Sequence, residues 1–568
     1  MTVEALPLAS RRLRRLDLES WVSGAAIVAL LVLILLPLLS LLWGSIAGPD
    51  GVSFGYFARV LSTRLYVQAL LNSLTLGAWT GFFSVFIGVP LAWAVVRTDL
   101  PGRGFVKLTA TLAYLSPPFL LAIAYVNLFS PRAGAVNVFL REALPSHDLT
   151  FNIFSMAGMV LVTIPHSFPF VYLLAASALA SVDASYEESA QILGAGKLRT
   201  ALTVTLPLVA PAILSGALIG FVNAIALFGS QAIVGLPARI FTLPTRIYAL
   251  FDYPPQYGLA SALSLVFVAI TVVALYLQRF YLARRSFVTL GGKGSRPQRL
   301  SLGAWRWPLF LFCVLIFVVA ILLPYGSLLA VSFSKSAGLA FWSNLTLANY
   351  RFILLDYDVT QRAIVNSLLL ASLAALFCVA LGLALGWIDV RTRLKARRFL
   401  DYVALIPLGL PGIVMAAALI QFWLRMPLAL YGTLAILFLA YAARYLPLGA
   451  RAANSALRQI DPSLEESARI LGASWGLTLR EVTLPLMRSS LFAGWVLVFV
   501  PTIQELSASI LLFSSKSITI AVAVYNLYEN GHIEAVAALA LVNVAIIALA
   551  IAIANWLGGA ETRAGALS

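Results

Sequence analysis

Long apolar runs separated by short polar segments make up the chain almost from end to end. A helix needs roughly 20 residues to cross a hydrocarbon core of about 30 Å. Runs of that length lie near residues 23–46, 68–96, 106–130, 153–180, 205–228, 258–280, 306–331, 364–388, 399–424, 430–455, 485–512 and 533–557. The pattern predicts an all-α membrane protein with about twelve transmembrane helices.

The first apolar run follows a cluster of arginines, as the apolar core of a signal peptide does. Its apolar stretch is too long for a cleaved signal, and a run of similar length recurs at 306–331. We therefore expect the first run to be a retained transmembrane helix.

Composition agrees with a polytopic membrane protein. Apolar residues make up 61% of the 568 positions, charged residues make up 11%, and the mean hydropathy is +0.94. These values do not fit a water-soluble surface. The two cysteines, Cys313 and Cys378, lie inside apolar runs, a placement that indicates neither a disulfide framework nor a cysteine metal site.

Positive charge predicts the orientation of the chain. The net charge is +16, and with a cytoplasmic N-terminus about 28 of the 39 Lys and Arg side chains fall on the inner side of the membrane. This bias places two polar segments, 183–208 and 461–486, in the cytoplasm. It also favours anionic membrane lipid, and not nucleic acid, as the partner of the basic clusters near 97–107, 284–299 and 391–398.

The chain repeats itself. Residues 72–103 align with 366–397 at one offset (366 − 72 = 294), and the polar segments align at a smaller offset (465 − 187 = 278). The first half therefore carries sixteen extra residues (294 − 278 = 16), which fall in the outer loop around 131–152. Six helices in each half make a parallel repeat, because both halves enter the membrane from the same side.

These patterns divide the chain into five parts. They are a cytoplasmic N-terminal segment (1–22), a first six-helix repeat (23–283), a basic cytoplasmic linker (284–304), a second six-helix repeat (305–558) and a C-terminal tail (559–568). Two repeats that face each other indicate a solute path along their interface.

The two polar segments align without a gap. They read DASYEESAQILGAGKLRTALTVTLPL (183–208) and DPSLEESARILGASWGLTLREVTLPL (461–486). Each predicts a helix of about two turns, a bend, and a second short helix that runs into the membrane at Pro207 or Pro485.

Local chemistry explains this predicted shape. A serine followed three residues later by a glutamate has the spacing of a capping box, and glycine next to the end of a helix adopts the left-handed conformation easily. The residues concerned are Ser185, Glu188 and Gly194, and in the second segment Ser463, Glu466 and Gly472. Asp183, Asp461, Glu187 and Glu465 suit the positive end of each helix.

The first helix of each segment looks like a docking element for a cytoplasmic partner. A helix of two turns is marginal alone in water. Its apolar residues, Ala190, Ile192 and Leu193 in the first copy, would need cover from another protein. We prefer this interpretation to that of a purely structural connector.

Both segments resemble the signature of ABC importer permeases, which runs Glu-Ala-Ala, three residues, Gly, nine residues, Ile, one residue, Leu-Pro. The matching residues are Glu188, Ser189, Ala190, Gly194, Val204, Leu206 and Pro207, and again Glu466, Ser467, Ala468, Gly472, Val482, Leu484 and Pro485. Serine replaces the first alanine and valine replaces the isoleucine in both copies. The resemblance implies the type I importer permease fold over nearly the whole chain.

The same resemblance implies partners and a site. In such permeases this segment is the coupling helix that fits a cleft on an ATPase subunit. The implied ATPase-coupling residues are Glu187, Glu188, Ala190, Gly194, Glu465, Glu466, Ala468 and Gly472. The implied partners are two copies of a cytoplasmic ATPase, which hold ATP and Mg, and a periplasmic or lipid-anchored solute-binding protein. The chain itself is expected to bind no cofactor and to lie in the bacterial inner membrane.

The fusion of two permease halves and the segment FVPTIQELSASILL (499–512) resemble the ferric-iron permease branch. This resemblance implies that the cargo is ferric iron, passed from a binding protein to the cytoplasm. Relatives of that branch carry thiamine, phosphonates, sugar phosphates or polyamines, and these cargoes stay open as alternatives.

Three polar residues are candidates for the solute path. Glu505 is the most informative, because a carboxylate at membrane depth should face water, a pore or a partner. Gln504 and Asn223 add polar groups on the corresponding helices of the two halves, while Leu227 occupies the position that matches Glu505. An alternative is that Glu505 meets only periplasmic water or a docking protein. No histidine or carboxylate cluster predicts a metal site.

Two other classes of protein fit less well. A secondary carrier driven by an ion gradient needs no docking segment, and RTDLPGRGF (97–105) has its charges in the wrong order for the major-facilitator signature. An enzyme would need a paired catalytic constellation, and none is found. GAGKLRT (194–200) is not a phosphate-binding loop, because Leu198 stands where Ser or Thr is required.

Overall fold

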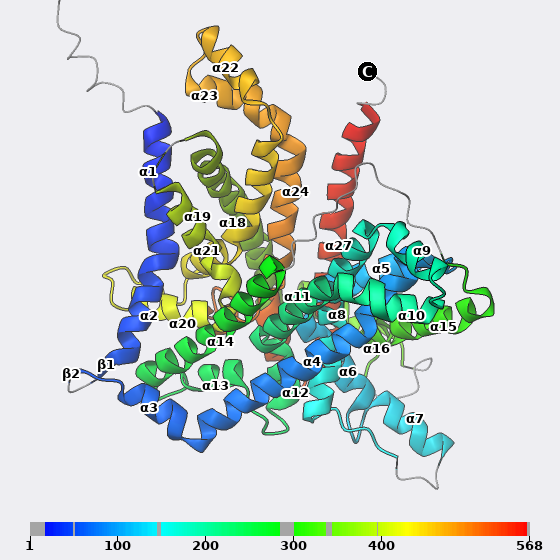
Figure 1. Cartoon of the computed structure of the whole chain (residues 1–568). Helices are drawn as coiled ribbons and strands as arrows, with labels where there is room; N and C mark the ends of the chain where they lie inside the picture. Colours follow the sequence, from blue (N-terminus) through cyan, green and yellow to red (C-terminus); the bar gives the residue numbers. More distant parts are fainter. Residues whose placement is uncertain are drawn as a thin grey trace, which may run out of the picture.

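The computed structural model describes residues 18–48, 51–144, 149–284, 300–336, 344–392, 394 and 396–564. Most of the predicted N-terminal segment and of the predicted linker lies outside these residues, as do the last residues of the tail. The described chain is almost entirely helical (Figure 1), which confirms the all-α prediction.

The first half runs from α1 to α14. Its elements are α1 (Leu18–Leu30), η2 (Leu31–Leu35), α2 (Leu36–Ile46), β1 (Ala47–Gly48), β2 (Gly51–Val52), α3 (Gly55–Ser62), α4 (Arg64–Arg97), α5 (Arg103–Leu115), α6 (Pro118–Phe129), α7 (Ala135–Ala143), α8 (Met156–Ser181), α9 (Ala184–Ile192), α10 (Lys197–Thr200), η3 (Ala201–Thr205), α11 (Leu206–Ala226), α12 (Gly229–Gly235), α13 (Leu243–Ala249) and α14 (Tyr257–Arg284). Strands β1 and β2 pair antiparallel in a short hairpin.

The second half runs from η4 to α27. Its elements are η4 (Gly303–Trp305), α15 (Arg306–Phe317), η5 (Val318–Leu322), α16 (Leu323–Ser332), α17 (Ala348–Arg351), η7 (Phe352–Asp356), α18 (Asp358–Arg391), α19 (Arg397–Leu405), η8 (Ile406–Gly409), α20 (Gly412–Trp423), α21 (Leu434–Arg458), α22 (Pro462–Ile470), α23 (Trp475–Thr478), η9 (Leu479–Thr483), α24 (Leu484–Ile503), α25 (Ser509–Leu512), α26 (Ile520–Glu529) and α27 (Ile533–Ala564).

Ten helices in the described residues are long and apolar enough to cross a membrane, and two bent pairs bring the count to twelve. The bent pairs are the spans predicted at 106–130 and 399–424: α5 and α6 meet at 101°, and the α19–η8 segment meets α20 at 115°. Proline lacks an amide hydrogen and holds the preceding residue extended. Pro117 and Pro411, both with extended backbone, stand at the two breaks.

The long helices of each half pack backbone to backbone at a repeated glycine. A Cβ on Gly88 of α4 would lie 3.0 Å from the carbonyl oxygen of Phe168 on α8, and a Cβ on Gly382 of α18 would lie 2.7 Å from the amide nitrogen of Ala450 on α21. The glycine repeated in the sequence therefore permits the same close approach in both halves.

A repeated Asn-Ser pair ties the long helix of each half to the segment before its short α13 or α26 helix. Asn72 donates to the carbonyl of Phe241, and the Ser73 hydroxyl accepts from the amide of Leu243. Asn366 and Ser367 make the matching contacts in the second half, with Ile518 and Ile520. Side chains thus satisfy backbone groups that these breaks in the helical structure leave unpaired.

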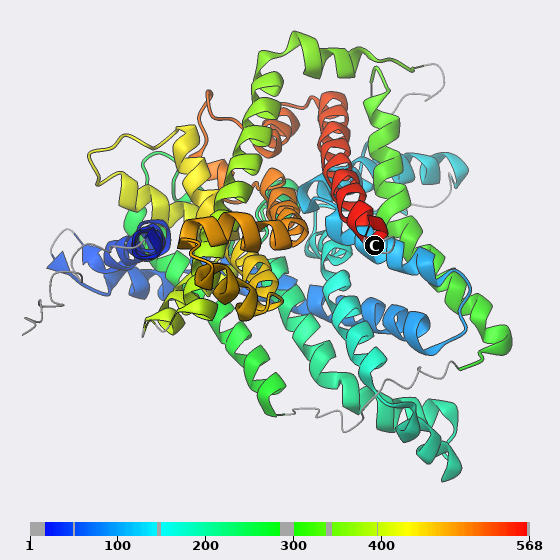
Figure 2. The ribbon, with the colours of Figure 1, turned by 90° about the horizontal axis from the view of Figure 1, so that it is seen from above.

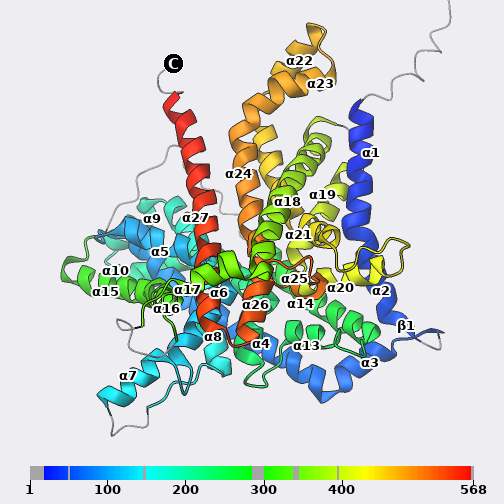
Figure 3. The same ribbon diagram turned by 180° about the vertical axis from the view of Figure 1, so that it is seen from behind.

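The first membrane-spanning segment of each half packs against the other half as well as its own. Helix α2 packs against α14 of its own half and α20 of the second half, whereas α16 packs against α27 of its own half and α6 of the first. Figures 1 and 3 show α1 standing beside α18 and α19, with α15 and α16 on the far side near α5 and α6. The main apolar core accordingly contains side chains from both halves.

Gly382→Ala should destabilise the protein by about 1–3 kcal/mol, because the added methyl group overpacks a backbone contact. The measurement is the thermal unfolding midpoint of the purified protein in detergent. Gly326→Ala in α16 is the matched control, because no atom lies within 4 Å of its added Cβ. The control should be neutral or slightly stabilising. Equal midpoints for the two variants would contradict the packing argument.

Candidate functional site

The two polar segments form knobs at the periphery of the molecule. In each, a short helix (α9 or α22) turns back into a second one (α10 or α23), which continues through a π-helical turn (η3 or η9) into a long membrane helix (α11 or α24). Figures 1 and 2 show the two knobs well apart, α22 and α23 at the top of Figure 1 and α9 and α10 at its right. This shape is the one predicted from the sequence.

The predicted capping boxes are wrong, because an aspartate two residues earlier caps each helix. The Asp183 carboxylate accepts from the amide of Ser185 at 2.9 Å, and the Asp461 carboxylate accepts from the amide of Ser463 at 2.9 Å. That second hydrogen bond holds the pKa of Asp461 below its usual range. The serines lie inside the helices, so Glu188 and its copy are not held by a capping contact.

The predicted C-terminal glycines are confirmed. Gly194 has φ +85° and Gly472 has φ +91°, both in the left-handed region. The amide of the following residue bonds back to the carbonyl of Ala190 or Ala468 at 3.0 Å. This is the arrangement in which glycine ends a helix without strain.

A buried ion pair fixes the first knob to its membrane helix. Glu187 is 8% exposed and lies 3.7 Å from Nε of Arg97, the last residue of α4. The Thr205 hydroxyl donates to the same carboxylate at 2.7 Å, and the Arg97 guanidinium donates to the carbonyl of Val182 at 2.8 Å. One carboxylate therefore joins α9, η3 and the end of α4.

The second knob has the same anchor. Glu465 is 5% exposed, lies 3.0 Å from Nε of Arg391 and accepts from Thr483 at 3.3 Å. Arg391 also donates to the carbonyl of Ile460 at 2.9 Å. The structure thus brings the two arginines into the site, although the sequence indicated only their charge. Their repetition at the end of each long helix was the signal that could have identified them.

The anchors change the roles expected of neighbouring residues. Because Glu187 and Glu465 are enclosed within the chain, their carboxylates do not face a partner. Glu188 and Glu466, one residue further on, are exposed, and Ala190 and Ala468 are half-buried. Each knob therefore presents one glutamate outward and turns its neighbour inward.

Each knob exposes two large apolar side chains. Ile192 and Leu193 are 86% and 87% exposed, and Ile470 and Leu471 are 85% and 88% exposed. Removing such groups from water is favourable, and an exposed apolar patch beside polar residues is typical of a protein interface. These pairs are the strongest sign that the knobs dock on another protein.

A cavity of about 220 Å³ lies between the two halves. Helices α5, α6, α8, α11 and α12 line it from the first half, and α21 and α24 line it from the second. The three residues predicted for the solute path, Asn223, Gln504 and Glu505, all line this cavity. Gln504 also donates across the interface to the carbonyl of Leu115, at the bend between α5 and α6.

Glu505 is held by three donors. Nε of Arg444 lies 2.9 Å from its carboxylate, the Tyr445 hydroxyl donates to it, and the amide of Ala508 donates to it at 2.8 Å. The residue is 5% exposed. Glu505 is thus bound by groups of its own chain, which contradicts the alternative that it meets only periplasmic water or a docking protein. The more open partner is Arg444, whose side chain is 20% exposed.

The cavity is asymmetric between the repeats. Arg444 corresponds to His166 (444 − 166 = 278) and Glu505 corresponds to Leu227 (505 − 227 = 278), and all four residues line the cavity. Only the second half thus supplies the ion pair. Within the described residues, no three His, Cys, Asp or Glu side chains form a group able to hold a metal ion.

Comparison with known proteins gives the family. A family model described as "Binding-protein-dependent transport system inner membrane component" matches residues 52–287 and 378–560, one stretch in each half. The chain belongs to this family. It is a multi-pass inner-membrane permease of an ABC importer, a transport subunit and not an enzyme, and it works with a solute-binding protein. This membership decides against a secondary carrier.

The similar proteins are named as permeases for ferric iron and for molybdenum. "Ferric transport system permease protein FbpB" of Actinobacillus pleuropneumoniae is 26% identical over 90% of this permease and 74% of its own length. "Fe(3+)-transport system permease protein FbpB 2" of Haemophilus influenzae is 24% identical over 84% and 87%. "Molybdenum transport system permease protein ModB" of Escherichia coli K12 is 31% identical over 39% and 94%.

A solved structure is also similar. It is titled "Crystal structure of bacterial alginate ABC transporter in complex with alginate pentasaccharide-bound periplasmic protein", and one of its chains is 21% identical with a TM-score of 0.38. The match covers 48% of this permease and 97% of that chain.

Arg391→Met should cost about 3 kcal/mol of stability, because it leaves the Glu465 carboxylate buried without its cation. Arg391→Met combined with Glu465→Met should recover most of that loss. Thermal unfolding in detergent measures both. Arg351→Met is the control, because its ion pair with Asp356 is exposed and contributes at most about 1 kcal/mol. An unstable double variant would contradict the assigned pairing.

Proposed function

We propose that this permease imports ferric iron, taking it from a periplasmic or lipid-anchored binding protein to the cytoplasm. The relatives named for ferric transport align with 84–90% of the chain, which supports this cargo over those of relatives that match one half. The excess of Lys and Arg on one side supports a cytoplasmic N-terminus.

Two copies of a cytoplasmic ATPase drive the import in this proposal, and they hold the ATP and Mg. The observation that carries the proposal is the exposed Ile-Leu pair and outward glutamate on each knob, set on a buried Arg-Glu anchor. Apolar side chains in the centre and a charge beside them are features of a docking surface. Two knobs of the same build fit two copies of one partner.

The anchors give the mechanism its rigid link. When ATP binding draws the ATPases together, each knob moves with its ATPase. Because Glu187 and Glu465 bind the ends of α4 and α18, those long helices move with the knobs. The two halves then rock against each other, and the cavity between them opens alternately to the two sides of the membrane.

Glu188→Ala combined with Glu466→Ala should lower ATP-driven uptake at least tenfold while ATP hydrolysis continues. Loss of a charge from a desolvated docking contact typically costs 2–5 kcal/mol or more, which is sufficient for that effect. The measurement compares uptake with ATP hydrolysis by the whole importer in proteoliposomes.

The control for this variant removes another exposed glutamate from the same segment. Glu481→Ala suits this purpose, because its side chain is 59% exposed and lies on η9, away from the exposed Ile-Leu pair. It should leave uptake unchanged. Full uptake by the double variant would refute the coupling role.

The cargo has its own test. The binding protein that purifies with the importer should retain ferric iron, as measured by metal analysis of the untreated protein. Retention of thiamine, a phosphonate, a sugar phosphate or a polyamine would replace iron as the cargo and leave the coupling role untouched.

A further inference from the structure

Three arginines form a stripe along one face of α21. Arg444, Arg451 and Arg458 are seven residues apart, which is close to two full helical turns, so their side chains leave the helix on nearly the same side. The matching positions of the first half hold His166, Leu173 and Ala180. The arginine stripe, defined by these three arginines, therefore exists in one half alone.

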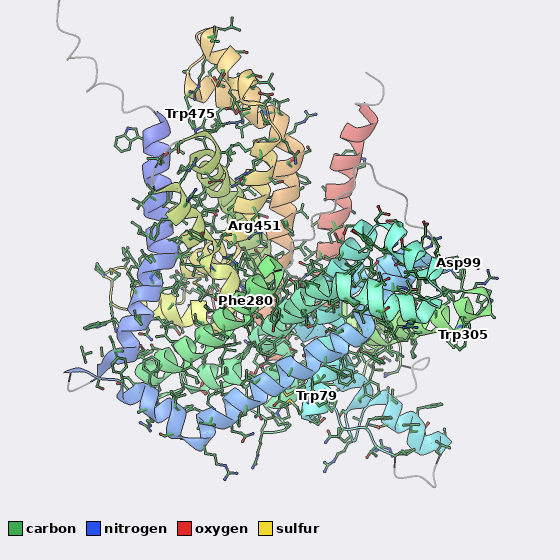
Figure 4. All side chains as sticks on the ribbon, viewed as in Figure 1. Trp79, Asp99, Phe280, Trp305, Arg451 and Trp475 are labelled. Carbon is green, nitrogen blue, oxygen red and sulfur yellow. The ribbon has the colours of Figure 1, made fainter. Side chains whose placement is uncertain are left out.

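The stripe leads from the cavity between the halves toward the second knob. Arg444 lines that cavity. Arg451 and Arg458 line a second cavity, of about 420 Å³, together with Asn454 and Ser455. Figure 4 shows Arg451 between Trp475 of the second knob, above it, and Phe280 of α14, below it.

Two of the carboxylates around the stripe are less exposed than the arginines that bind them. Glu505 is 5% exposed, whereas the side chain of Arg444 is 20% exposed. Asp389 has a side-chain exposure of 23% and binds Arg458, which is 65% exposed, at 2.9 Å. A solute entering the smaller cavity thus meets Arg444 before it meets Glu505, whereas in the larger cavity Asp401 is exposed beside the arginines.

Positive charge exceeds negative charge in the larger cavity. Arg397, Arg451 and Arg458 face Asp401 there, and Asp389 binds Arg458. Arg397 donates to the backbone carbonyls of Asp389 and Thr392 and not to a carboxylate.

We infer that the arginine stripe is a path for a solute with anionic oxygens on its surface. Guanidinium groups bind oxyanions and carboxylates through paired hydrogen bonds. This inference rests on the proposed function and adds the chemical form in which the cargo passes. Ferric iron is a hard cation that takes anionic oxygen ligands. Iron would therefore pass as a complex coordinated by such ligands and not as a bare cation.

Charge selectivity in the larger cavity tests the path without any assumption about iron. Ser455→Cys, in a background of Cys313→Ala and Cys378→Ala, places one thiol beside Arg451 and Arg458. The complete importer in nanodiscs is treated with a methanethiosulfonate reagent carrying either a sulfonate or a trimethylammonium group. Each reagent's rate with the introduced thiol is divided by its rate with a free thiol in solution. The ratio for the sulfonate reagent should be about ten times that for the trimethylammonium reagent, because basic clefts concentrate anions.

Charge-removing variants complete this test. Arg451→Gln with Arg458→Gln should abolish the preference for the sulfonate reagent, and Arg451→Lys with Arg458→Lys should retain much of it. Arg351→Gln, which removes an exposed arginine elsewhere, should have no effect. A faster reaction with the cationic reagent would overturn the inference. Failure of both reagents to react would place the cavity against lipid and overturn it equally.

Uptake by the complete importer separates this inference from the proposed cargo. Proteoliposomes are supplied with binding protein and labelled ferric iron, phosphate or molybdate. Arg451→Gln with Arg458→Gln should reduce iron uptake at least fivefold, with the lysine pair partly restoring it. Sulfonate preference with uptake of an oxyanion alone would refute iron and support the path. Iron uptake unchanged by the glutamine pair would refute the path and leave iron as the cargo.

Discussion

A buried glutamate bound by an arginine at the end of a long membrane helix is the contact on which each knob depends. Without it, a two-turn helix at the membrane surface would have little to hold its shape, because isolated helices of that length are marginal in water. With it, the knob is tied to the end of the long helix by a buried ion pair. The exposed Ile-Leu pairs can then serve docking, since the anchor supplies the stability that they do not.

The two halves share this anchor but differ where they meet. At the knobs, arginine, glutamate and threonine recur in both copies with the same contacts. In the cavity, an Arg-Glu pair in the second half faces a histidine and a leucine in the first. Repetition persists where two identical partners are expected, whereas a single solute path imposes no such symmetry.

Much of this could be predicted from sequence. The helical spans, the duplication and the glycine-ended knobs follow from local patterns, and the structure confirms them. The capping boxes did not form, because Asp183 and Asp461 reach the free amides first. The sharp bends within the spans at 106–130 and 399–424 could not be predicted, since a proline that merely kinks a helix and one that breaks it look alike in sequence. The arginine stripe was not identified from the sequence, because a spacing of seven gains significance only from the cavities that the three side chains line.

The sequence by itself determined that the chain crosses the membrane many times, that it is a duplicated permease, and where its knobs lie. Hydropathy, repetition and motif spacing are properties of short stretches and need no partner in space. Only the tertiary structure decided that Glu188 faces outward while Glu187 is buried, and that Glu505 is locked by Arg444. The physical reason is that burial and ion pairing depend on which distant residue arrives beside a carboxylate, and for Glu187 that residue is Arg97, at the end of a helix far earlier in the chain.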